Sequence, residues 1–263
     1  MVIAAIGITI VSVLVVYLAI SAYIAHSLMK VPRLPLGDTP ASVGLAYEDV
    51  SFPSRIDKLT LKGWYVAGEK TFTIIIVTGM HQNRVDYSIG TLEITKDLVE
   101  RGYSVLLFDL RGRGESQGKG VLMTKVERDI GGAFVYIKRR GCPADNIGII
   151  SFSAGAASTI IFAGQQEDMA AVVIESCFVD VTNTFIRKTS SILGMPKSLI
   201  KVFPFGIYLM SRVMYGYRRV NPLDRIADIA CPILLIQGEK DDLIPAEDTR
   251  KLLKASGNPS DEL

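Results

Sequence analysis

The sequence predicts an α/β protein with a mainly parallel, doubly wound sheet. Short runs rich in Ile, Val and Leu alternate with helix-compatible segments, an order that places helices on both faces of one sheet. Between Asn146 and Ile160, an apolar run gives way to small residues and then to a helical segment, which indicates a sharp strand-to-helix turn. With 263 residues, 49% of them hydrophobic, the chain can bury a full core in one large domain.

The N-terminal segment is predicted to be a transmembrane signal anchor, residues 1–28. No charged side chain occurs from Val2 to Ala25, and a helix of this length spans the roughly 30 Å hydrocarbon core. A cleaved signal peptide is the alternative, but it would have a basic start and a shorter apolar run. Lys30 and Arg33 follow the span, so the positive-inside tendency predicts a single-pass protein of the cell membrane with its domain in the cytoplasm.

The next segment, residues 29–45, is predicted to be a linker because it contains Pro32, Pro35, Pro40 and Gly37. The globular domain is expected over residues 46–263. Its predicted strands are 47–52, 59–66, 72–77, 104–109, 147–152, 171–175 and 232–237. Its predicted helices are 89–100, 126–139, a segment that follows the small residues 153–157 and reaches 166, and 246–255.

Composition argues against several function classes. The net charge of +2 is small and its basic residues are scattered, so no nucleic-acid surface is predicted. Three separated cysteines and two histidines predict no metal site and no cofactor. The stretch from Arg111 to Gly114 lacks the lysine and the spacing of a phosphate-binding P-loop, and is interpreted as a structural turn near the site.

The strand-to-helix turn contains Ser151-Phe152-Ser153-Ala154-Gly155. This is the G-x-S-x-G nucleophile elbow with its first glycine replaced by Ser151. Small residues two positions before and after a serine let the strand and helix pass closely, while the hydroxyl stands clear of the backbone. Ser153 is therefore the predicted nucleophile, and Ser151 is the rival candidate.

Four motifs in one order extend this observation. They are Tyr47 to Phe52, Asp109 to Ser116, the elbow at Ser153, and Gly238 to Pro245. Together they resemble the α/β-hydrolase superfamily, serine hydrolase type, from Tyr47 to the end of the chain. The resemblance implies an α/β-hydrolase fold whose oxyanion hole uses the backbone N–H groups of Met80 and Ala154. The usual His-Gly before the first of these donors is Thr78-Gly79 here, which backbone donors tolerate.

The same resemblance implies that Asp241, three residues after Gly238, is the acid of the triad. Asp242 beside it is interpreted as a solvated turn residue. Glu175 and Asp180, which follow the sixth strand, are the alternative acids.

The triad histidine should follow the acid in the chain. The sequence has only His26, interpreted as an interfacial polar residue, and His81, interpreted as a loop histidine rather than a relocated base. The chain ends where the fold would add a last strand and helix, so we expect these to be missing. Strand 232–237 is then an exposed edge, and the chain is expected to be inactive or weakly active as an enzyme.

Residues 181–220 are predicted to be a helical cap insertion rich in apolar side chains, namely Phe185, Ile192, Leu193, Phe203, Phe205, Ile207, Tyr208, Leu209, Met210, Met214, Tyr215 and Tyr217. These side chains either bind a hydrophobic acyl group or pack the cap onto the core. Two functions remain open at this point. One is a membrane-anchored serine hydrolase of carboxylic esters, with peptidase or thioesterase activity as variants, and the other is a non-catalytic binding or scaffold protein.

Overall fold

The structure is a computed structural model, and it describes residues 2–194, 196–219 and 221–257. Side chains at 183, 185, 188, 191–193, 197 and 199 also lie outside the description, which includes Phe185, Ile192 and Leu193 of the predicted cap. Internal contacts divide the chain into two units. We call Met1–Lys30 with Val181–Arg219 the helical unit, and Val31–Asp180 with Val220–Leu263 the sheet unit.

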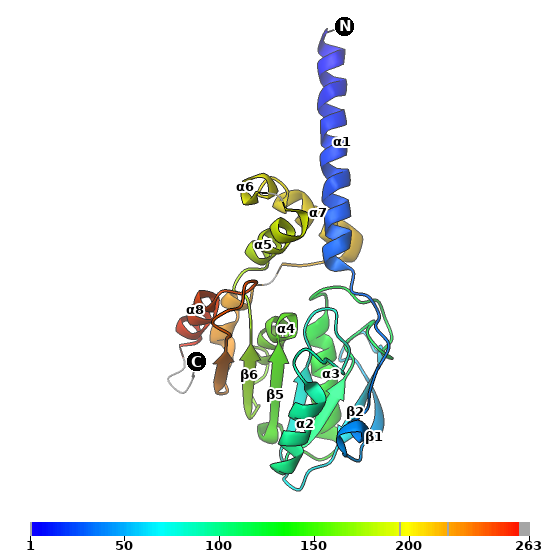
Figure 1. The fold of residues 1–263 in the computed structure, drawn as a ribbon, viewed down its shortest axis with the longest axis vertical. Coiled ribbons are helices and arrows are strands. Elements are labelled where there is room, and N and C mark those ends of the chain that lie inside the picture. The colour runs from blue at the N-terminus through cyan, green and yellow to red at the C-terminus, as the bar shows by residue number, and fades with distance from the viewer. Residues whose placement is uncertain (1, 195, 220, 258–263) are drawn as a thin grey trace. The chain divides into compact units, whose positions relative to one another are not determined.

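The sheet unit contains a seven-stranded sheet in the order β1-β2-β4-β3-β5-β6-β7 (Figure 1). Its strands are β1 (Glu48–Pro53), β2 (Thr60–Val66), β3 (Thr73–Val77), β4 (Ser104–Phe108), β5 (Ile147–Phe152), β6 (Ala171–Glu175) and β7 (Ile233–Ile236). β1 and β2 pair antiparallel, as do β2 and β4, and every other pairing is parallel. The predicted fold class is confirmed, including the early hairpin.

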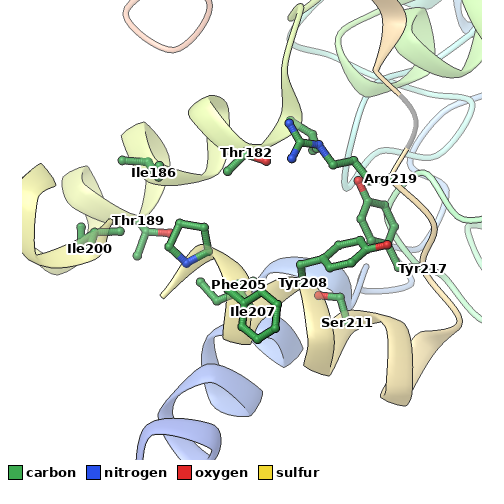
Figure 2. A pocket seen from close by; sticks show the side chains of 12 residues that line it. Thr182, Ile186, Thr189, Ile200, Phe205, Ile207, Tyr208, Ser211, Tyr217 and Arg219 are labelled. Carbon is green, nitrogen blue, oxygen red and sulfur yellow. The ribbon is translucent and has the colours of Figure 1, made fainter. Parts of the chain in front are cut away.

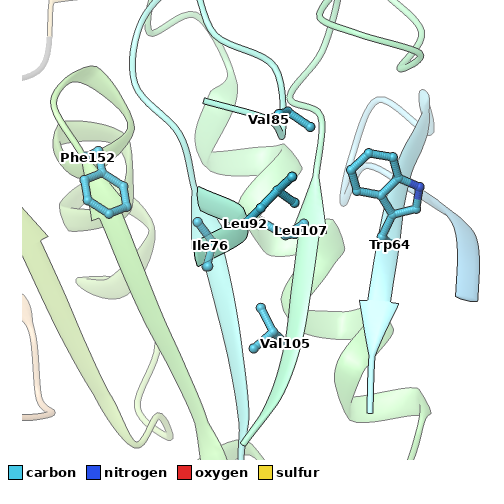
Figure 3. Packing of buried hydrophobic residues seen from close by; sticks show 7 residues of the cluster. All are labelled: Trp64, Ile76, Val85, Leu92, Val105, Leu107 and Phe152. Carbon is cyan, nitrogen blue, oxygen red and sulfur yellow. The ribbon is translucent and has the colours of Figure 1, made fainter. Parts of the chain in front are cut away.

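Helices cover both faces of this sheet, as the parallel pairing requires. They are α2 (Thr91–Glu100), α3 (Val126–Arg139), α4 (Ala154–Ala163) and α8 (Ala246–Ser256), with short 3-10 turns at Pro40–Val43, Ala144–Asn146, Pro222–Asp224 and Ile226–Asp228. On one face, Leu92 of α2 packs with Trp64, Ile76 and Leu107 of the strands (Figure 3).

On the opposite face, aromatic rings join the sheet to α3 and α4. Phe52 of β1 stacks on Tyr136 of α3 with ring centroids 4.8 Å apart, and Phe134 of α3 meets Phe162 of α4 at 5.5 Å. Ile75 and Ile76 of β3 and Ile149 of β5 are almost fully buried, as expected of strands that are covered on both faces of the sheet.

Among the described residues, β7 is the edge strand next to β6, and Leu234 and Ile236 on it are 38% and 42% exposed. Apolar side chains on a sheet edge favour association with other chains.

The helical unit is built from α1 (Val2–Met29), α5 (Val181–Leu193), α6 (Lys197–Ile200) and α7 (Pro204–Tyr215). α1 is long and apolar enough to cross a membrane, with a mean hydropathy of 2.7 over an 18-residue window. α7 packs along the C-terminal half of α1 through a core of Ile24, Ala25, Leu28 and Ile207. The N-terminal helix and the helices after residue 180 therefore form one unit, although more than 150 residues separate them in the sequence.

Candidate functional site

Ser153 lies at the sharp turn between β5 and α4. Its φ of 52° and ψ of −120° are unusual for a residue other than glycine, and such strain is typical of functional turns. Its backbone N–H donates to the carbonyl oxygen of Glu175 at 2.9 Å, which ties the turn to the end of β6. Ser153 as a residue is only partly buried.

Ser151, the rival nucleophile, lies inside β5. It is fully buried, and its hydroxyl donates to the carbonyl oxygen of Val173 on the neighbouring strand at 3.2 Å. A hydroxyl held in the sheet in this way is poorly placed to attack a substrate.

Two glycines let the elbow fit against the loop after β3. A Cβ on Gly155 would come within 2.4 Å of the carbonyl oxygen of Thr78, a distance that no side chain tolerates. A Cβ on Gly79 would lie 3.3 Å from the Cβ and 4.0 Å from the Oγ of Ser153. The backbone of the β3 loop therefore passes directly beside the serine.

This arrangement places the two predicted oxyanion donors on segments that flank Ser153. Ala154 is the first residue of α4, and the first N–H groups of a helix have no carbonyl partner within the helix. Met80 follows Gly79 in the loop beside the serine and is half-buried. Backbone N–H groups in such positions can stabilise the negative oxygen of a tetrahedral intermediate.

Arg113 ties the loop after β3 to the loop after β4. Its side chain is almost fully buried, and its guanidinium donates to the carbonyl oxygens of Gly79 at 2.5 Å and Gln82 at 3.4 Å. Burial lowers the pKa of Arg113 to about 10, although Asp129 and Asp109 raise it. This stretch was predicted to be a structural turn near the site, and no local pattern in the sequence indicates that Arg113 holds the loop after β3.

Asp109 reinforces the same junction from the end of β4. Its buried carboxylate accepts backbone N–H bonds from Arg84 at 2.8 Å and Glu115 at 2.9 Å. Burial raises the pKa of Asp109, and the nearby positive charge of Arg84 opposes that rise. The guanidinium of Arg84 also lies over the ring of Trp64, 4.1 Å from its centre. The loop from Thr78 to Gly90 is therefore anchored by buried charges.

Asp241 lies in the turn after β7, which itself follows β6 and β5 across the sheet in parallel order. The carboxyl ends of these three strands share one edge, so Ser153, Glu175 and Asp241 follow neighbouring strands at that edge. One carboxylate oxygen of Asp241 accepts the backbone N–H groups of Leu243 and Ile244 at 2.9 Å each, and the other accepts from the Gln237 side chain at 3.2 Å. These bonds fix the orientation of the carboxylate.

The remaining acidic candidates differ in environment. Asp242 is exposed, as a solvated turn residue should be. Glu175 is partly buried at the end of β6, and burial raises the pKa of its carboxyl. Asp180 is the last residue of the first segment of the sheet unit.

The two histidines lie in different units. His26 belongs to α1, where its Nδ1 is 2.6 Å from the hydroxyl of Tyr215 on α7. His81 belongs to the loop after β3, two residues beyond Gly79, and has a positive φ of 67°. Within the described ranges, no group of three or more His, Cys, Asp or Glu side chains is placed to hold a metal ion.

The helical unit contains a separate pocket of about 310 Å³ between α5 and α7 (Figure 2). Its walls are mostly apolar, with Ile186 of α5 facing Ile207 and Tyr208 of α7, and with Arg219 at one end. A pocket of this size and lining suits a small apolar ligand or an acyl chain.

Comparisons with known proteins agree with this architecture. The serine aminopeptidase S33 family matches residues 68–212, which is more than half of the chain. The uncharacterized protein YqkD of Bacillus subtilis is 30% identical over 204 residues, which cover 76% of this chain and 65% of YqkD, slightly less than two thirds of that relative. The uncharacterized protein YfhR of Escherichia coli K12 is 25% identical over 81% of this chain and 69% of its own length.

Among solved structures, the esterase Pf2001 of Pyrococcus furiosus is similar over 90% of this chain and 87% of its own, with a TM-score of 0.75 and 27% identity. The acylaminoacyl peptidase of Pyrococcus horikoshii shares the fold over 83% of this chain and 37% of its own, with a TM-score of 0.60 and 19% identity.

Proposed function

The chain belongs to the serine aminopeptidase S33 family within the α/β-hydrolase superfamily, and on that premise we propose that it is a serine hydrolase of carboxylic esters with Ser153 as its nucleophile. One observation carries this proposal. Ser153 is held at a positive φ between β5 and α4, with the backbone of Gly79 against its side chain. A serine presented in this way can reach a carbonyl carbon while flanking amides receive the carbonyl oxygen.

The proposed reaction proceeds in two balanced steps. The Oγ of Ser153 bonds to the acyl carbon and loses its proton to a base, and the negative carbonyl oxygen is held by the N–H groups of Met80 and Ala154. The bond from carbon to the alcohol oxygen then breaks, and the alcohol leaves with the proton. A water molecule then attacks the acyl-serine in the same way, and the carboxylic acid is released.

Asp241 is the proposed acid, with the role of orienting a histidine and stabilising it when protonated. The family order places that histidine after the acid, and residues 242–263 contain none. We therefore expect the 263-residue chain to acylate slowly, because an unassisted serine hydroxyl is a weak nucleophile. The second candidate function is a binding protein that keeps the fold without turnover.

For the substrate, we propose esters of hydrophobic acyl groups. The similarity to an esterase supports an ester substrate, and the apolar pocket within the helical unit has a size and lining that suit an acyl chain. We further propose that α1 anchors the protein in the cell membrane with the sheet unit in the cytoplasm, since Lys30 and Arg33 follow the apolar span.

The test measures Ser153 acylation in the detergent-solubilised chain with a fluorophosphonate probe and with short- and medium-chain acyl esters. Free imidazole is added as a diffusible base, because it can substitute for a missing histidine in accepting the serine proton. We expect imidazole to accelerate labelling of the native chain at Ser153, Ser153→Ala to abolish labelling, and Ser151→Ala to retain it. Ester hydrolysis by Ser153→Ala gives the background from imidazole alone.

The alternatives give different results. If the native chain is not labelled with or without imidazole, the non-catalytic function replaces the hydrolase. If labelling is fast without imidazole and His81→Ala removes it, His81 is the base and the assignment of the base by chain order is wrong.

A further inference from the structure

Charge is divided unevenly between the two units. The helical unit contains eight Lys and Arg residues and no Asp or Glu. All 27 Asp and Glu, with the remaining 21 Lys and Arg, belong to the sheet unit. The net charge of +2 is therefore the sum of a net charge of +8 on the helical unit and a net charge of −6 on the sheet unit. A surface with this much positive charge attracts anions.

α7 is attached to the apolar N-terminal helix by close and specific contacts. The ring of Tyr17 stacks on Phe203 with centroids 5.6 Å apart. The Tyr17 hydroxyl accepts a hydrogen bond from the N–H of Gly206 at 3.0 Å and donates one to the carbonyl oxygen of Val202 at 3.1 Å. Gly206 lies so close that an added Cβ would come within 2.3 Å of the Ser21 hydroxyl. The start of α7 is thus fixed at the level of Tyr17 and Ser21 on α1.

That level lies at membrane depth if α1 spans the bilayer. Residues 2–16 of α1 are all exposed, and as a helix they extend about 23 Å. The hydrocarbon core is about 30 Å thick, so roughly five more residues of α1 are needed to cross it. Those residues are 17–21, the segment that contacts the first turn of α7.

The side of α7 that faces away from the packed core is also apolar. Phe205, Leu209 and Val213 are 73%, 36% and 70% exposed, and their spacing of four residues places them along one stripe of the helix. Val202, just before the helix, is 61% exposed. Apolar surface of this kind, on a helix bordered by the exposed cations Lys201 and Arg212, is typical of helices that lie in a membrane interface.

We propose that this stripe, which we call the α7 stripe (Val202, Phe205, Leu209 and Val213), lies in the interface of the bilayer that α1 spans, with the surrounding cations on anionic lipid headgroups. The inference rests on the proposed anchoring by α1. The lipid bilayer is the occupant, rather than a partner protein, because the stripe begins at the depth where the uncovered apolar surface of α1 ends. An anionic surface also suits a unit without a carboxylate.

The test places an environment-sensitive fluorophore on single cysteines of the full chain in lipid nanodiscs. A Cys142→Ser background leaves Cys177 and Cys231, which are buried, as the native thiols. Labels go on Phe205→Cys and Val213→Cys in the stripe. Ile10→Cys on α1 and Ile56→Cys on the sheet unit are the matched controls, since both native side chains are 62% exposed. Nanodiscs contain phosphatidylcholine alone or with phosphatidylglycerol, and spin-labelled lipids act as contact quenchers.

We expect labels at residues 205 and 213 to shift to the blue and to be quenched by spin-labelled lipid, more strongly with phosphatidylglycerol. The label at residue 10 should be quenched in both lipids and the label at residue 56 in neither. Quenching at 10 without quenching at 205 and 213 overturns the inference and leaves the anchor standing. A blue shift at 205 without lipid quenching shows that protein covers the stripe, which also overturns it. Absence of quenching at residue 10 overturns the anchor, and this inference with it.

Discussion

The guanidinium of Arg113 donates a 2.5 Å hydrogen bond to the carbonyl oxygen of Gly79, the residue whose backbone lies against the side chain of Ser153. The bond joins two loops that follow neighbouring strands, β4 and β3. Because the N–H of Met80 belongs to the peptide unit that includes this carbonyl, the bond fixes the direction in which the proposed oxyanion donor points. Arg113 is therefore a positioning residue for the proposed oxyanion hole.

We predict that Arg113→Lys slows fluorophosphonate labelling of Ser153 by about 10- to 100-fold, in line with the loss of one well-placed oxyanion donor or less. A lysine keeps the charge but cannot reproduce the fork of a guanidinium. The control is Arg128→Lys, a partly buried arginine that pairs with Asp57 away from Gly79. Equal rates for Arg113→Lys and the native chain would show that the bond does not position the donor.

Ser153→Gly should stabilise the fold while it removes the nucleophile. Glycine adopts a φ of 52° without the steric cost that serine bears, so we expect a gain of about 1 kcal/mol in the free energy of unfolding. Ser153→Ala removes the same hydroxyl and keeps the strain, so it should show no such gain. Denaturant unfolding of the two variants measures the difference, and equal stabilities would mean that the elbow stores no strain.

Asp241 should matter for the turn after β7 as well as for catalysis. Asp241→Ala removes the acceptor of two backbone N–H bonds and should cost about 1–3 kcal/mol of stability. Asp241→Asn retains an oxygen acceptor and should cost less, yet it should impair imidazole-assisted acylation as strongly if the negative charge orients the base. The exposed neighbour supplies the control, since Asp242→Ala should change neither quantity.

Burial of Glu175 predicts a pH-dependent stability difference. Its pKa is raised in the folded state above the usual 4.5, so the folded chain binds a proton there more readily than the unfolded chain does. The stability associated with this proton is present below the unfolded pKa and is lost as the pH rises through the folded value.

Glu175→Gln, which stays neutral, should therefore equal the native chain near pH 4 and become more stable than it as the pH rises toward about 7. Glu167→Gln at an exposed position should show no such divergence. Unfolding curves across this range measure it. Acylation that survives in Glu175→Gln would also remove Glu175 from the candidate acids.

The pocket of the helical unit is expected to bind a medium-length acyl chain. Ile186→Trp adds bulk to a pocket of about 310 Å³, so binding of a fluorescent medium-chain fatty acid by the full chain should weaken roughly 10-fold or more. Ile56→Trp, on an exposed site of the sheet unit, is the matched control. Equal binding by Ile186→Trp and the native chain would mean that the pocket does not hold the acyl chain.

The strands of the sheet could be predicted from the sequence because each is a local run of apolar residues. The runs at 147–152 and 171–175 begin and end where the structure places β5 and β6. The predicted end of an element differs from the observed end where a turn residue interrupts the hydrophobic pattern. Helix α2 begins at Thr91 rather than Ile89 because Gly90 adopts a positive φ of 67°.

Contacts between distant residues were not predictable in this way. Arg113 and Gly79 are 34 residues apart, and Tyr17 and Gly206 are 189 apart, with no local pattern that pairs them. The elbow could be recognised because its function imposes small residues at fixed positions. For the packing of α1 on α7, the sequence contains only Gly206 as an indication of close contact. A single glycine does not identify the helix that it contacts.

The double hydrogen bond of the Tyr17 hydroxyl has a consequence for the order of assembly. α1 leaves the ribosome first, yet its partners Val202 and Gly206 follow only after every strand from β1 to β6 has been synthesised. Until then, the Tyr17 hydroxyl lacks these two partners, and its pairing waits on a contact between residues 189 apart. If α1 enters the bilayer as proposed, its insertion comes first and completion of the helical unit comes late, so a ribosome-bound chain that ends before residue 200 would hold α1 in the bilayer without the helix that packs against it.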